Sequence, residues 1–198
     1  MNNSTYFAYL TRLRWIKRWG LMRNAYPENV MEHSWEVATI AHTLALIKNR
    51  YFAGDVDANA VATVALYHDV TEVITGDLPT PIKYHSEAIN QAYKNIEHQA
   101  ARELLNLLPD GLKQDFQSIL SDHHQIKEQQ ELIKIADKIS AYLKCKAELN
   151  AGNQGFKTAA KELLKKIEQS HLPEVSYFMT VFAPACGLTL DRLMQANA

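Results

Sequence analysis

Apolar residues recur along most of the chain at the spacing of an α-helix. In residues 30–50, Val37, Ile40, Leu44 and Ile47 lie three or four positions apart, which places them on one helical face. The pattern predicts further helices over residues 5–19, 57–75, 86–108, 112–121, 128–149, 154–169 and 174–182. No stretch alternates apolar and polar residues with a sustained period of two, so the pattern predicts an all-helical chain.

Capping residues indicate where several of these helices begin and end. Asn29 precedes a helix whose third residue is Glu32, which is the arrangement of a capping box. Asp57 is a favourable N-cap for the next helix, and Gly20 is expected to end the first one. Residues 76–81 contain one glycine and two prolines within six positions, so we expect this segment to be non-helical.

Composition supports the same fold class. The chain has 198 residues, with 24 Ala and 22 Leu but only 9 Val, and Ala and Leu are stronger helix formers than Val. No low-complexity run, linker or fixed repeat divides the chain. A chain of this length can bury about 70% of its unfolded surface, so it needs no metal or disulfide merely to fold. We therefore expect one all-α domain over residues 1–198.

The charge balance limits the kinds of partner. Lys and Arg number 21 against 22 Asp and Glu, and the formal charge of -1 argues against polymeric nucleic acid or an anionic membrane as a partner. No apolar run is long enough to span a bilayer, and the N-terminus lacks the apolar core of a signal peptide. Two cysteines are too few for a disulfide framework. We expect a soluble, reduced, cytoplasmic protein.

Four polar residues interrupt the apolar helical faces. His33 lies one turn before Val37 and continues its stripe, and His68 continues the stripe of the following helix. Asp69 follows His68 directly, and Asp137 lies in the middle of a third strong helix. A buried carboxylate is costly unless it is paired or bound to a metal. Two imidazoles and two carboxylates suit a divalent transition metal, with coordination positions left for water or substrate.

Each of these residues also has a simpler interpretation. Any one histidine is compatible with a hydrogen-bonded position in the core or at the surface. Asp137 could pair with Lys134 on the same helix, for about a few tenths of a kcal/mol. A His-Asp dipeptide such as His68-Asp69 also arises by chance in a chain of this composition. The metal hypothesis therefore depends on all three helices together, not on one residue.

The other chemically active side chains are expected to be structural. His42 lies nine positions after His33, about 180° around a helix, so it is not expected to join the same site. His123 and His124 are expected in a surface segment, and Lys83 is expected to be solvated. Cys145 and Cys186 are expected to pack as small apolar side chains. The sequence thus predicts one metal site and no second one.

The ordered set of His33, His68-Asp69 and Asp137 resembles the metal-binding signature of the HD-domain phosphohydrolases, an all-helical superfamily. Three segments are more specifically similar to its bacterial 5'-deoxynucleotidase branch: RWGLMRNAYPENVMEHS, ALYHDVTEVITGDLPTPIKY and KIADKISAYLKC. The resemblance extends over residues 6–190, which is nearly the whole chain. Thr71, where relatives can have Ser or Ala, is a mild departure that affects no catalytic position.

The resemblance implies a single-domain HD-type helical bundle that is an enzyme. In that family the four signature positions bind one divalent cation, and cobalt or another transition metal commonly supports activity. The family enzyme removes phosphate from deoxyribonucleoside 5'-monophosphates as a homodimer. For this chain, the resemblance therefore implies a phosphomonoesterase with four metal ligands: His33, His68, Asp69 and Asp137.

Two acidic residues after the His-Asp pair are candidates for acid–base chemistry. Glu72 lies four positions after His68, so on one helix both would project from the same face. Glu72 could then hold or deprotonate the attacking water without binding the metal; the alternative is a solvated carboxylate at a helix end. Asp77 could contact the sugar or protonate the leaving 5' oxygen, or be an ordinary turn residue. The resemblance makes Glu72 catalytic and assigns the loop of Asp77 to substrate, and we predict a catalytic role for both.

The remaining predicted site residues would contact the substrate. Arg18 and Trp19 could be a basic residue at a helix C-terminus and a core indole, but the resemblance assigns them to the selection of deoxyribose. The family uses the loop around Thr80 for substrate, and Thr80 could donate to phosphate. The predicted substrate-binding set is Arg18, Trp19, Asp69, Asp77, Leu78, Pro79, Thr80 and Asp137. No polar set in these segments would obviously read the base, so all bases are expected to be accepted to some degree.

Two other functions stay open on sequence grounds. Another HD phosphohydrolase activity would cleave a nucleoside triphosphate or a signalling nucleotide, but the motif segments lack an evident surplus of Lys and Arg for several phosphates. A non-enzymatic metal- or nucleotide-binding module is the other possibility. Release of inorganic phosphate from a panel of mono-, di- and triphosphates with added metal distinguishes the three functions.

Overall fold

The computed structural model describes residues 3–120 and 126–196, and this part of the chain consists of helices and connecting turns, without a β-strand. The α-helices are α1 (Tyr6–Leu10), α2 (Val30–Tyr51), α3 (Ala58–Leu66), α4 (Glu72–Thr75), α5 (Thr80–Lys83), α6 (Glu87–Asn106), α7 (Asp110–Leu120), α8 (Lys127–Asn150), α9 (Lys157–Glu168), α10 (Pro173–Val181) and α11 (Leu190–Ala196). Short 3-10 helices cover Thr11–Trp15, Gln154–Phe156 and Ala183–Gly187. The prediction of an all-α chain is confirmed. Within the described residues, no helix is long and apolar enough to cross a membrane.

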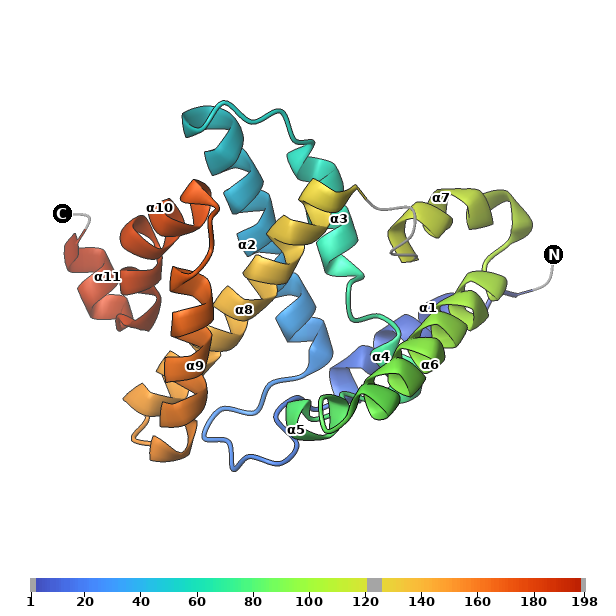
Figure 1. Ribbon diagram of the computed structural model, residues 1–198, viewed down its shortest axis with the longest axis horizontal. Helices are drawn as coiled ribbons and strands as arrows, with labels where there is room; N and C mark the ends of the chain where they lie inside the picture. The colour runs from blue at the N-terminus through green and yellow to red at the C-terminus, as the bar shows by residue number, and fades with distance from the viewer. Residues whose placement is uncertain (1–2, 121–125, 197–198) are drawn as a thin grey trace.

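The central core is built from α2, α3, α8 and α10. Figure 1 shows α2 and α8 crossing near the middle of the molecule, with α3 beside α2. Leu44 of α2 and Leu132 and Ile139 of α8 are fully buried in this core. Each such side chain contributes roughly 1.5–3 kcal/mol by leaving water. The two helices that carry His33 and Asp137 are therefore held together by apolar packing.

The predicted N-caps of α2 and α3 are confirmed. Asn29 Oδ1 accepts a hydrogen bond from the Glu32 N–H at 3.0 Å, and Glu32 Oε2 accepts from the Asn29 N–H at 3.2 Å. Asp57 caps α3 by accepting from two backbone N–H groups at the start of that helix. Each cap stabilises its helix by about 1 kcal/mol, so these local sequence signals fix where both helices begin.

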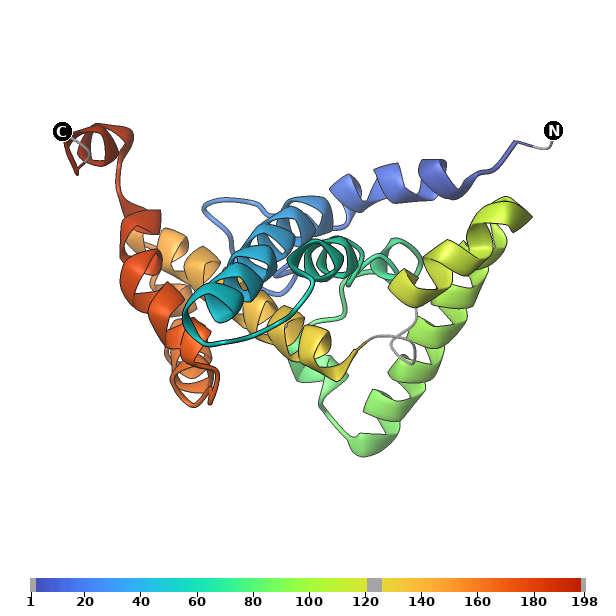
Figure 2. The ribbon, with the colours of Figure 1, turned by 90° about the horizontal axis from the view of Figure 1, so that it is seen from above.

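A second apolar cluster lies toward another end of the molecule. Tyr6 of α1, Leu13, Val70 and Leu104 of α6 are buried there together. Figure 2 shows α6 and α7 at this end, while α11, which the sequence analysis did not predict, projects at the opposite end. Residues 67–79 connect α3, in the central core, with this second cluster, and they carry several predicted site residues.

The prediction of one helix over residues 5–19 is right only in part, because α1 and the following 3-10 helix cover residues 6–15 and end there. After a short 3-10 turn the chain becomes extended and forms an isolated antiparallel bridge between Lys17 and Asn29. Backbone hydrogen bonds across this bridge satisfy groups that a longer helix would have used. Arg18 and Trp19 therefore lie in a loop beside the start of α2, and not at the C-terminus of a helix.

The helix predicted over residues 57–75 is interrupted before its end. Residues 67–71 form turns between α3 and α4, and His68 and Asp69 lie in these turns. Hydrogen bonds from an N–H to the third carbonyl before it replace the α-helical pattern there. His68 and Glu72 therefore do not share one helix face, contrary to the expectation from their four-residue spacing.

The prediction that residues 76–81 are non-helical is right only in part. Residues 76–79 connect α4 to α5, and Gly76 has a φ of 71°, which glycine adopts more easily than other residues. Thr80 and Pro81, in contrast, form the first turn of α5. Proline is tolerated there because the N–H groups of a first helical turn have no partner within the helix.

A buried carboxylate anchors the loop over residues 18–27 to α8. Glu148 is fully buried and accepts hydrogen bonds from the backbone N–H groups of Ala25 at 2.8 Å and Tyr26 at 2.9 Å. Lys144, one turn earlier on α8, pairs with Glu148 and also donates to the Tyr26 carbonyl. Buried charges that are paired and hydrogen-bonded hold one specific geometry, so the loop has a fixed position against α8.

Candidate active site

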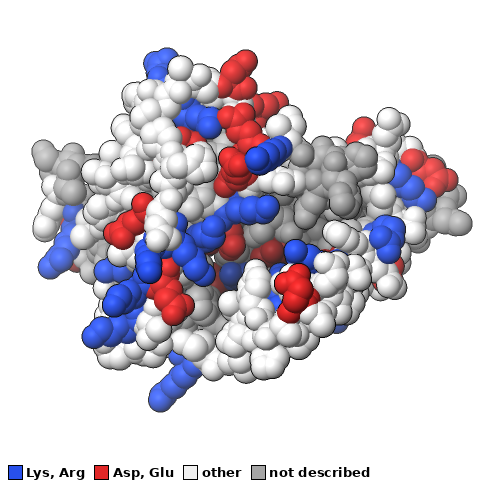
Figure 3. All heavy atoms as spheres, in the orientation of Figure 1, with Lys and Arg blue, Asp and Glu red and all other residues white. Residues whose placement is uncertain are grey.

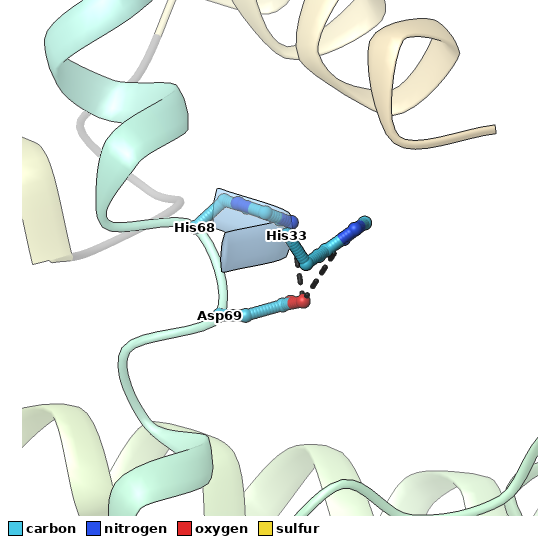
Figure 4. Close-up of side chains that lie close together, drawn as sticks. All are labelled: His33, His68 and Asp69. Atoms are coloured by element: carbon cyan, nitrogen blue, oxygen red, sulfur yellow. Dashed lines mark ion pairs between the residues drawn. The ribbon is translucent and has the colours of Figure 1, made fainter. Parts of the chain in front are cut away.

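Three of the four predicted metal ligands converge between α2 and the turns that follow α3. Figure 4 shows the carboxylate of Asp69 facing the imidazole rings of both His33 and His68. Asp69 Oδ2 lies 3.2 Å from His68 Nε2 and 3.6 Å from His33 Nε2. One nitrogen or oxygen atom from each of the three residues lies within 4.8 Å of the other two. This spacing allows a single metal ion to contact all three side chains.

The fourth predicted ligand, Asp137, approaches the same point from α8. Its Oδ1 lies 3.1 Å from His33 Nε2. The alternative interpretation, a pair with Lys134, does not occur among the ion pairs of the described residues. The structure thus brings together four side chains from α2, α8 and the turns after α3, although they are far apart in the sequence.

Both histidines present a nitrogen that fits a metal ion. His68 Nδ1 lies 2.7 Å from the Ala65 carbonyl oxygen, so this nitrogen carries the proton and donates it. The Nε2 atoms of His33 and His68 are buried and make no hydrogen bond of regular geometry. Buried polar atoms without a partner are uncommon. Two of them beside two carboxylates fit the donor set of a divalent transition metal.

A buried relay fixes the tautomer of His33. Its Nδ1 lies 3.1 Å from Ser140 Oγ, and Ser140 donates to Glu36 Oε2 at 2.6 Å. Because the hydroxyl proton of Ser140 points to Glu36, Ser140 accepts from His33 Nδ1 and leaves Nε2 unprotonated. Sequence analysis missed both residues, although Glu36 lies three positions after His33 and Ser140 three positions after Asp137. That helical spacing is the signal that could have found them.

Replacing Ser140 with alanine is expected to weaken the binding of a divalent transition metal by about 10–100-fold, because His33 is then free to adopt the other tautomer. Calorimetric titration of the metal-free protein with Co²⁺ or Zn²⁺ measures this change. Ser34→Ala is the matched control, since Ser34 is buried next to His33 but its hydroxyl makes no hydrogen bond. Equal affinity of the wild type and Ser140→Ala would contradict the relay.

The surroundings keep the two clustered carboxylates ionised. Burial opposes ionisation of Asp69, but the two histidines and Arg18 outweigh it and hold the pKa of Asp69 well below its usual range. Burial also opposes ionisation of Asp137, but the imidazole of His33, whose Nε2 lies 3.1 Å from Asp137 Oδ1, outweighs it and lowers the pKa of Asp137. Both side chains are therefore anionic near neutral pH, as metal binding requires.

Glu72 is buried beside these residues at the start of α4. The residue is only 7% exposed, and its Oε2 has no hydrogen-bond partner. Burial raises the pKa of Glu72, and the negative charges of Asp69 and Asp77 raise it further. The alternative of a solvated carboxylate is therefore wrong. A buried carboxyl group with a raised pKa and an unpartnered oxygen is a candidate for proton transfer with a water molecule near the cluster.

A cavity of about 570 Å³ extends from Asp137 and contains most of the predicted substrate residues. The predicted residues that line it are Arg18, Trp19, Asp77, Pro79, Thr80 and Asp137. Leu78 is half-buried and does not line the cavity, so the structure does not bring it together with the others. Burial raises the pKa of Asp77, partly offset by Arg18. Arg18 also connects the cavity with the metal-binding cluster, because its Nη1 lies 3.3 Å from Asp69 Oδ2.

The opposite wall of this cavity comes from α8 and α9. Lys138, Leu163 and Lys166 lie on it, and sequence analysis had no reason to assign α9 to the site. In Figure 3, Lys and Arg side chains gather over α8 and α9, beside a hollow that faces α5. The sequence-based argument that the site lacks basic residues for several phosphates is therefore weakened.

Other histidines and Lys83 stay outside the cluster. His42 is not among the residues that converge with His33 in the described part of the chain. The two histidines expected in a surface segment, His123 and His124, lie outside the described residues. Lys83 is not freely solvated as predicted, because its Nζ lies 3.0 Å from Glu97 Oε1. This ion pair occupies the ammonium group that could otherwise bind phosphate.

The two cysteines differ in their surroundings. Cys145 is buried on α8 and packs against Phe156, as predicted for a small apolar side chain. Cys186 is exposed, so the prediction of apolar packing is wrong for it. The reason is its position in the short 3-10 helix Ala183–Gly187, none of whose residues is buried.

The fold is shared with solved HD-domain phosphohydrolases. One from Listeria innocua matches with a TM-score of 0.80 over 92% of this chain and 88% of that chain, at 24% sequence identity. The HD phosphohydrolase of cyanophage S-2L, solved with dA and one catalytic Zn²⁺ ion, matches with a TM-score of 0.62 over 93% and 98% of the two chains, at 20% identity. The chain therefore has the fold of these HD-domain phosphohydrolases, and the His and Asp cluster lies within that fold.

Closer sequence relatives identify the branch. A family model described as 5'-deoxynucleotidase YfbR-like matches residues 5–186. The 5'-deoxynucleotidase yfbR of Photorhabdus temperata is 52% identical over 190 residues, which is 96% of each chain. A 5'-deoxynucleotidase of Pectobacterium atrosepticum is 48% identical over 195 residues, 98% of each chain. The chain belongs to the YfbR-like 5'-deoxynucleotidase family.

Proposed function

We propose that the chain is a metal-dependent phosphomonoesterase that hydrolyses deoxyribonucleoside 5'-monophosphates to deoxyribonucleosides and phosphate. The observation that carries this proposal is the cluster of two histidines and two aspartates at one end of a cavity of about 570 Å³. Pockets for small molecules have volumes of roughly 300–1,000 Å³, so a nucleoside monophosphate fits. The full-length similarity to proteins named 5'-deoxynucleotidase supports the same activity.

In this proposal His33, His68, Asp69 and Asp137 hold one divalent cation, cobalt or another transition metal. When bound, such an ion neutralises charge on the phosphate and lowers the pKa of a water molecule. The chain's own contribution is to hold both Nδ1 atoms against hydrogen-bond partners, so that both Nε2 atoms face the cluster, and to keep both carboxylates ionised. Asp69 and Asp137 also face the phosphate from this position.

Glu72 and Asp77 supply the proton transfers. A cation held by the cluster would favour the ionised form of Glu72, and the unpartnered Oε2 would then orient the attacking water and take its proton while the water oxygen bonds to phosphorus. The bond between phosphorus and the 5' oxygen breaks, and that oxygen needs a proton as it leaves. Asp77, on the cavity wall with a pKa raised by burial, is suited to donate this proton or to contact the sugar.

Arg18 and Trp19 select the sugar, and the loop with Leu78, Pro79 and Thr80 closes the phosphate side of the cavity. Four of these five residues line it, all except Leu78. We further propose a single cytoplasmic domain over residues 1–198 that acts as a homodimer on free nucleotides, without polymeric nucleic acid or a membrane as partner.

Sugar selection gives the test of this function. Deoxyribonucleoside monophosphates are expected to be cleaved with a kcat/KM about 5–150-fold above that of the matched ribonucleotides, because a 2'-hydroxyl buried against Trp19 finds no partner. Arg18→Ala should reduce this ratio without loss of metal, while Arg14→Ala, an exposed arginine on the preceding 3-10 turn, should not. Equal kcat/KM for both sugars in the wild type would leave a general 5'-nucleotidase.

A second candidate activity, on nucleotides with more phosphates, is favoured by one observation. Lys138 and Lys166 line the same cavity as Arg18, and cationic side chains stabilise additional phosphate groups. A panel of mono-, di- and triphosphates assayed for phosphate release at one metal concentration decides between the two activities. Faster release from triphosphates than from monophosphates would overturn the proposal of a monophosphatase.

A further inference from the structure

One carboxylate holds both residues that are proposed to select the sugar. Glu28 Oε2 accepts a hydrogen bond from the indole Nε1 of Trp19 at 2.8 Å and from Arg18 Nε at 3.3 Å. Only 11% of the Glu28 side chain is exposed. The backbone joins them as well, since the Arg18 N–H donates to the Glu28 carbonyl at 3.1 Å. Glu28 is thus a shared anchor on the strand-like segment opposite the two residues.

The backbone of Trp19 needs such an anchor. Its φ is 58°, in the left-handed region that a bulky side chain rarely occupies. A strained conformation of this kind persists only where several independent contacts hold it, and it is enriched at functional sites. Here the Trp19 carbonyl accepts from the Met22 N–H at 2.8 Å, and the indole packs 5.2 Å from the ring of Phe156. Asn24 also donates to the Trp19 carbonyl, and the bond to Glu28 adds a polar contact to the indole itself, which fixes the rotation of its ring.

Glu28 also sets the orientation of Arg18. The guanidinium is held on one edge by Glu28, while its Nη1 lies 3.3 Å from Asp69 Oδ2 in the metal-binding cluster. Without Glu28, Asp69 would be the remaining ion-pair partner of Arg18 among the described residues, and the guanidinium could rotate toward it. Glu28 itself does not line the substrate cavity; it borders a separate surface hollow with Tyr26 and Trp35.

We propose that Glu28 is a positioning residue that sets discrimination between 2'-deoxyribose and ribose. It acts without contact to the substrate, by holding Trp19 and Arg18 in fixed positions. These two side chains form the wall of the cavity that faces C2' of the sugar. A wall that moves by a fraction of an ångström admits the extra hydroxyl, so rigidity is what selection requires. The proposal rests on the proposed function, in which Arg18 and Trp19 contact the sugar.

The test compares kcat/KM for matched deoxy- and ribonucleoside monophosphates in three variants. Glu28→Ala is expected to lower the deoxy-to-ribo ratio about tenfold, through KM more than kcat, because the hydrogen bonds lost involve a charged acceptor. Glu28→Gln keeps an oxygen for the indole and should recover part of the ratio. Glu32→Ala is the matched control: it removes the same charge four residues away, at the capping box, and touches neither Arg18 nor Trp19.

A double-mutant cycle separates positioning from a general loss of structure. Trp19→Phe keeps a ring but removes the indole N–H, so Glu28→Gln should change the ratio less in that background than in the wild type. In the NMR spectrum of the metal-free protein, Glu28→Gln should shift the indole resonance that Trp19→Phe removes. This readout does not depend on activity.

The outcomes distinguish failure of the role of Glu28 from failure of the proposed function. A sugar-selective wild type whose ratio is unchanged in both Glu28 variants would overturn the role of Glu28 and leave the proposed function intact. A wild type that releases no phosphate from either nucleotide, or releases it equally from both, would overturn the proposed function and the role of Glu28 with it. A fall in the ratio for Glu32→Ala equal to that for Glu28→Ala would also overturn the role of Glu28.

Discussion

His68→Ala is expected to abolish phosphate release and to leave the protein without bound metal. His68 supplies one of two buried, unpartnered Nε2 atoms, and Asp69 Oδ2 lies 3.2 Å from it. Loss of this nitrogen leaves three ligands, of which two are carboxylates, and removes the partner that helps hold the pKa of Asp69 low. Chelation of the wild type should have the same effect on activity, and added Co²⁺ or another divalent transition ion should restore the wild type only.

Thermal unfolding gives a readout that does not depend on turnover. Because the four side chains come from α2, α8 and the turns after α3, a bound ion stabilises the folded chain relative to the unfolded one. At a free metal concentration about 100 times Kd, this stabilisation amounts to about 2.7 kcal/mol. Wild type should therefore melt at a higher temperature with metal, and His68→Ala should not.

The matched control is His42→Ala. His42 lies on α2 outside the cluster, so this variant should keep its metal, its activity and its metal-dependent rise in Tm. Full activity of His68→Ala in protein shown to be metal-free would refute the assignment of the cluster.

The part of the site that lies on regular helices could be predicted from sequence. His33 continues the apolar stripe of α2, and for that reason its buried position follows from helical periodicity. Asp137 stands out on α8 as a carboxylate beside apolar residues, although its side chain is 43% exposed. The caps at Asn29 and Asp57 were predictable because capping depends only on residues within one turn.

The turns that hold His68 and Asp69 could not be predicted, because their cause is packing between distant segments. Val61 on α3 belongs to the central core, whereas Val70 packs into the second cluster with Leu104. The chain must change direction between these two valines to bury both. Local propensity contains no information about this, and tertiary packing overrides it.

The loop that contains Trp19 could not be predicted either, because contacts between distant segments hold it. Its anchor, Glu148, is 123 positions from Ala25 in the sequence, and the bond between them leaves no periodic signal. The positive φ of Trp19 is also unexpected for a bulky residue. Such a conformation becomes recognisable only when contacts with Glu28 and Phe156 are seen in three dimensions.

Glu72→Gln is expected to lower kcat by about 10²–10⁴-fold, the usual contribution of general acid–base catalysis, while metal content and nucleotide binding are kept. The substitution preserves the size of the side chain but removes its ability to take a proton. Glu174→Gln is the matched control, because Glu174 is likewise buried with an unpartnered Oε2, but lies on α10 outside the site. A parallel fall of metal content and rate in Glu72→Gln would reassign Glu72 as a metal ligand.

The same substitution should stabilise the metal-free protein, and increasingly so as the pH rises. Burial raises the pKa of Glu72 above its ordinary value of 4.5, with Asp69 and Asp77 adding to the shift. Above pH 4.5 the unfolded chain releases this proton while the folded chain retains it, so wild-type stability falls as the pH rises toward and through neutrality. Glutamine has no such proton, so its contribution to stability does not change with pH.

Denaturant unfolding in the presence of chelator at pH 5 and pH 8 measures this difference. The free energy of unfolding of Glu72→Gln should exceed that of the wild type by more at pH 8 than at pH 5. An equal excess at both pH values would mean that Glu72 is already ionised in the folded state. Because Glu72 is costly to the fold and its Oε2 is left without a partner, its place at this site is explained by the reaction and not by stability.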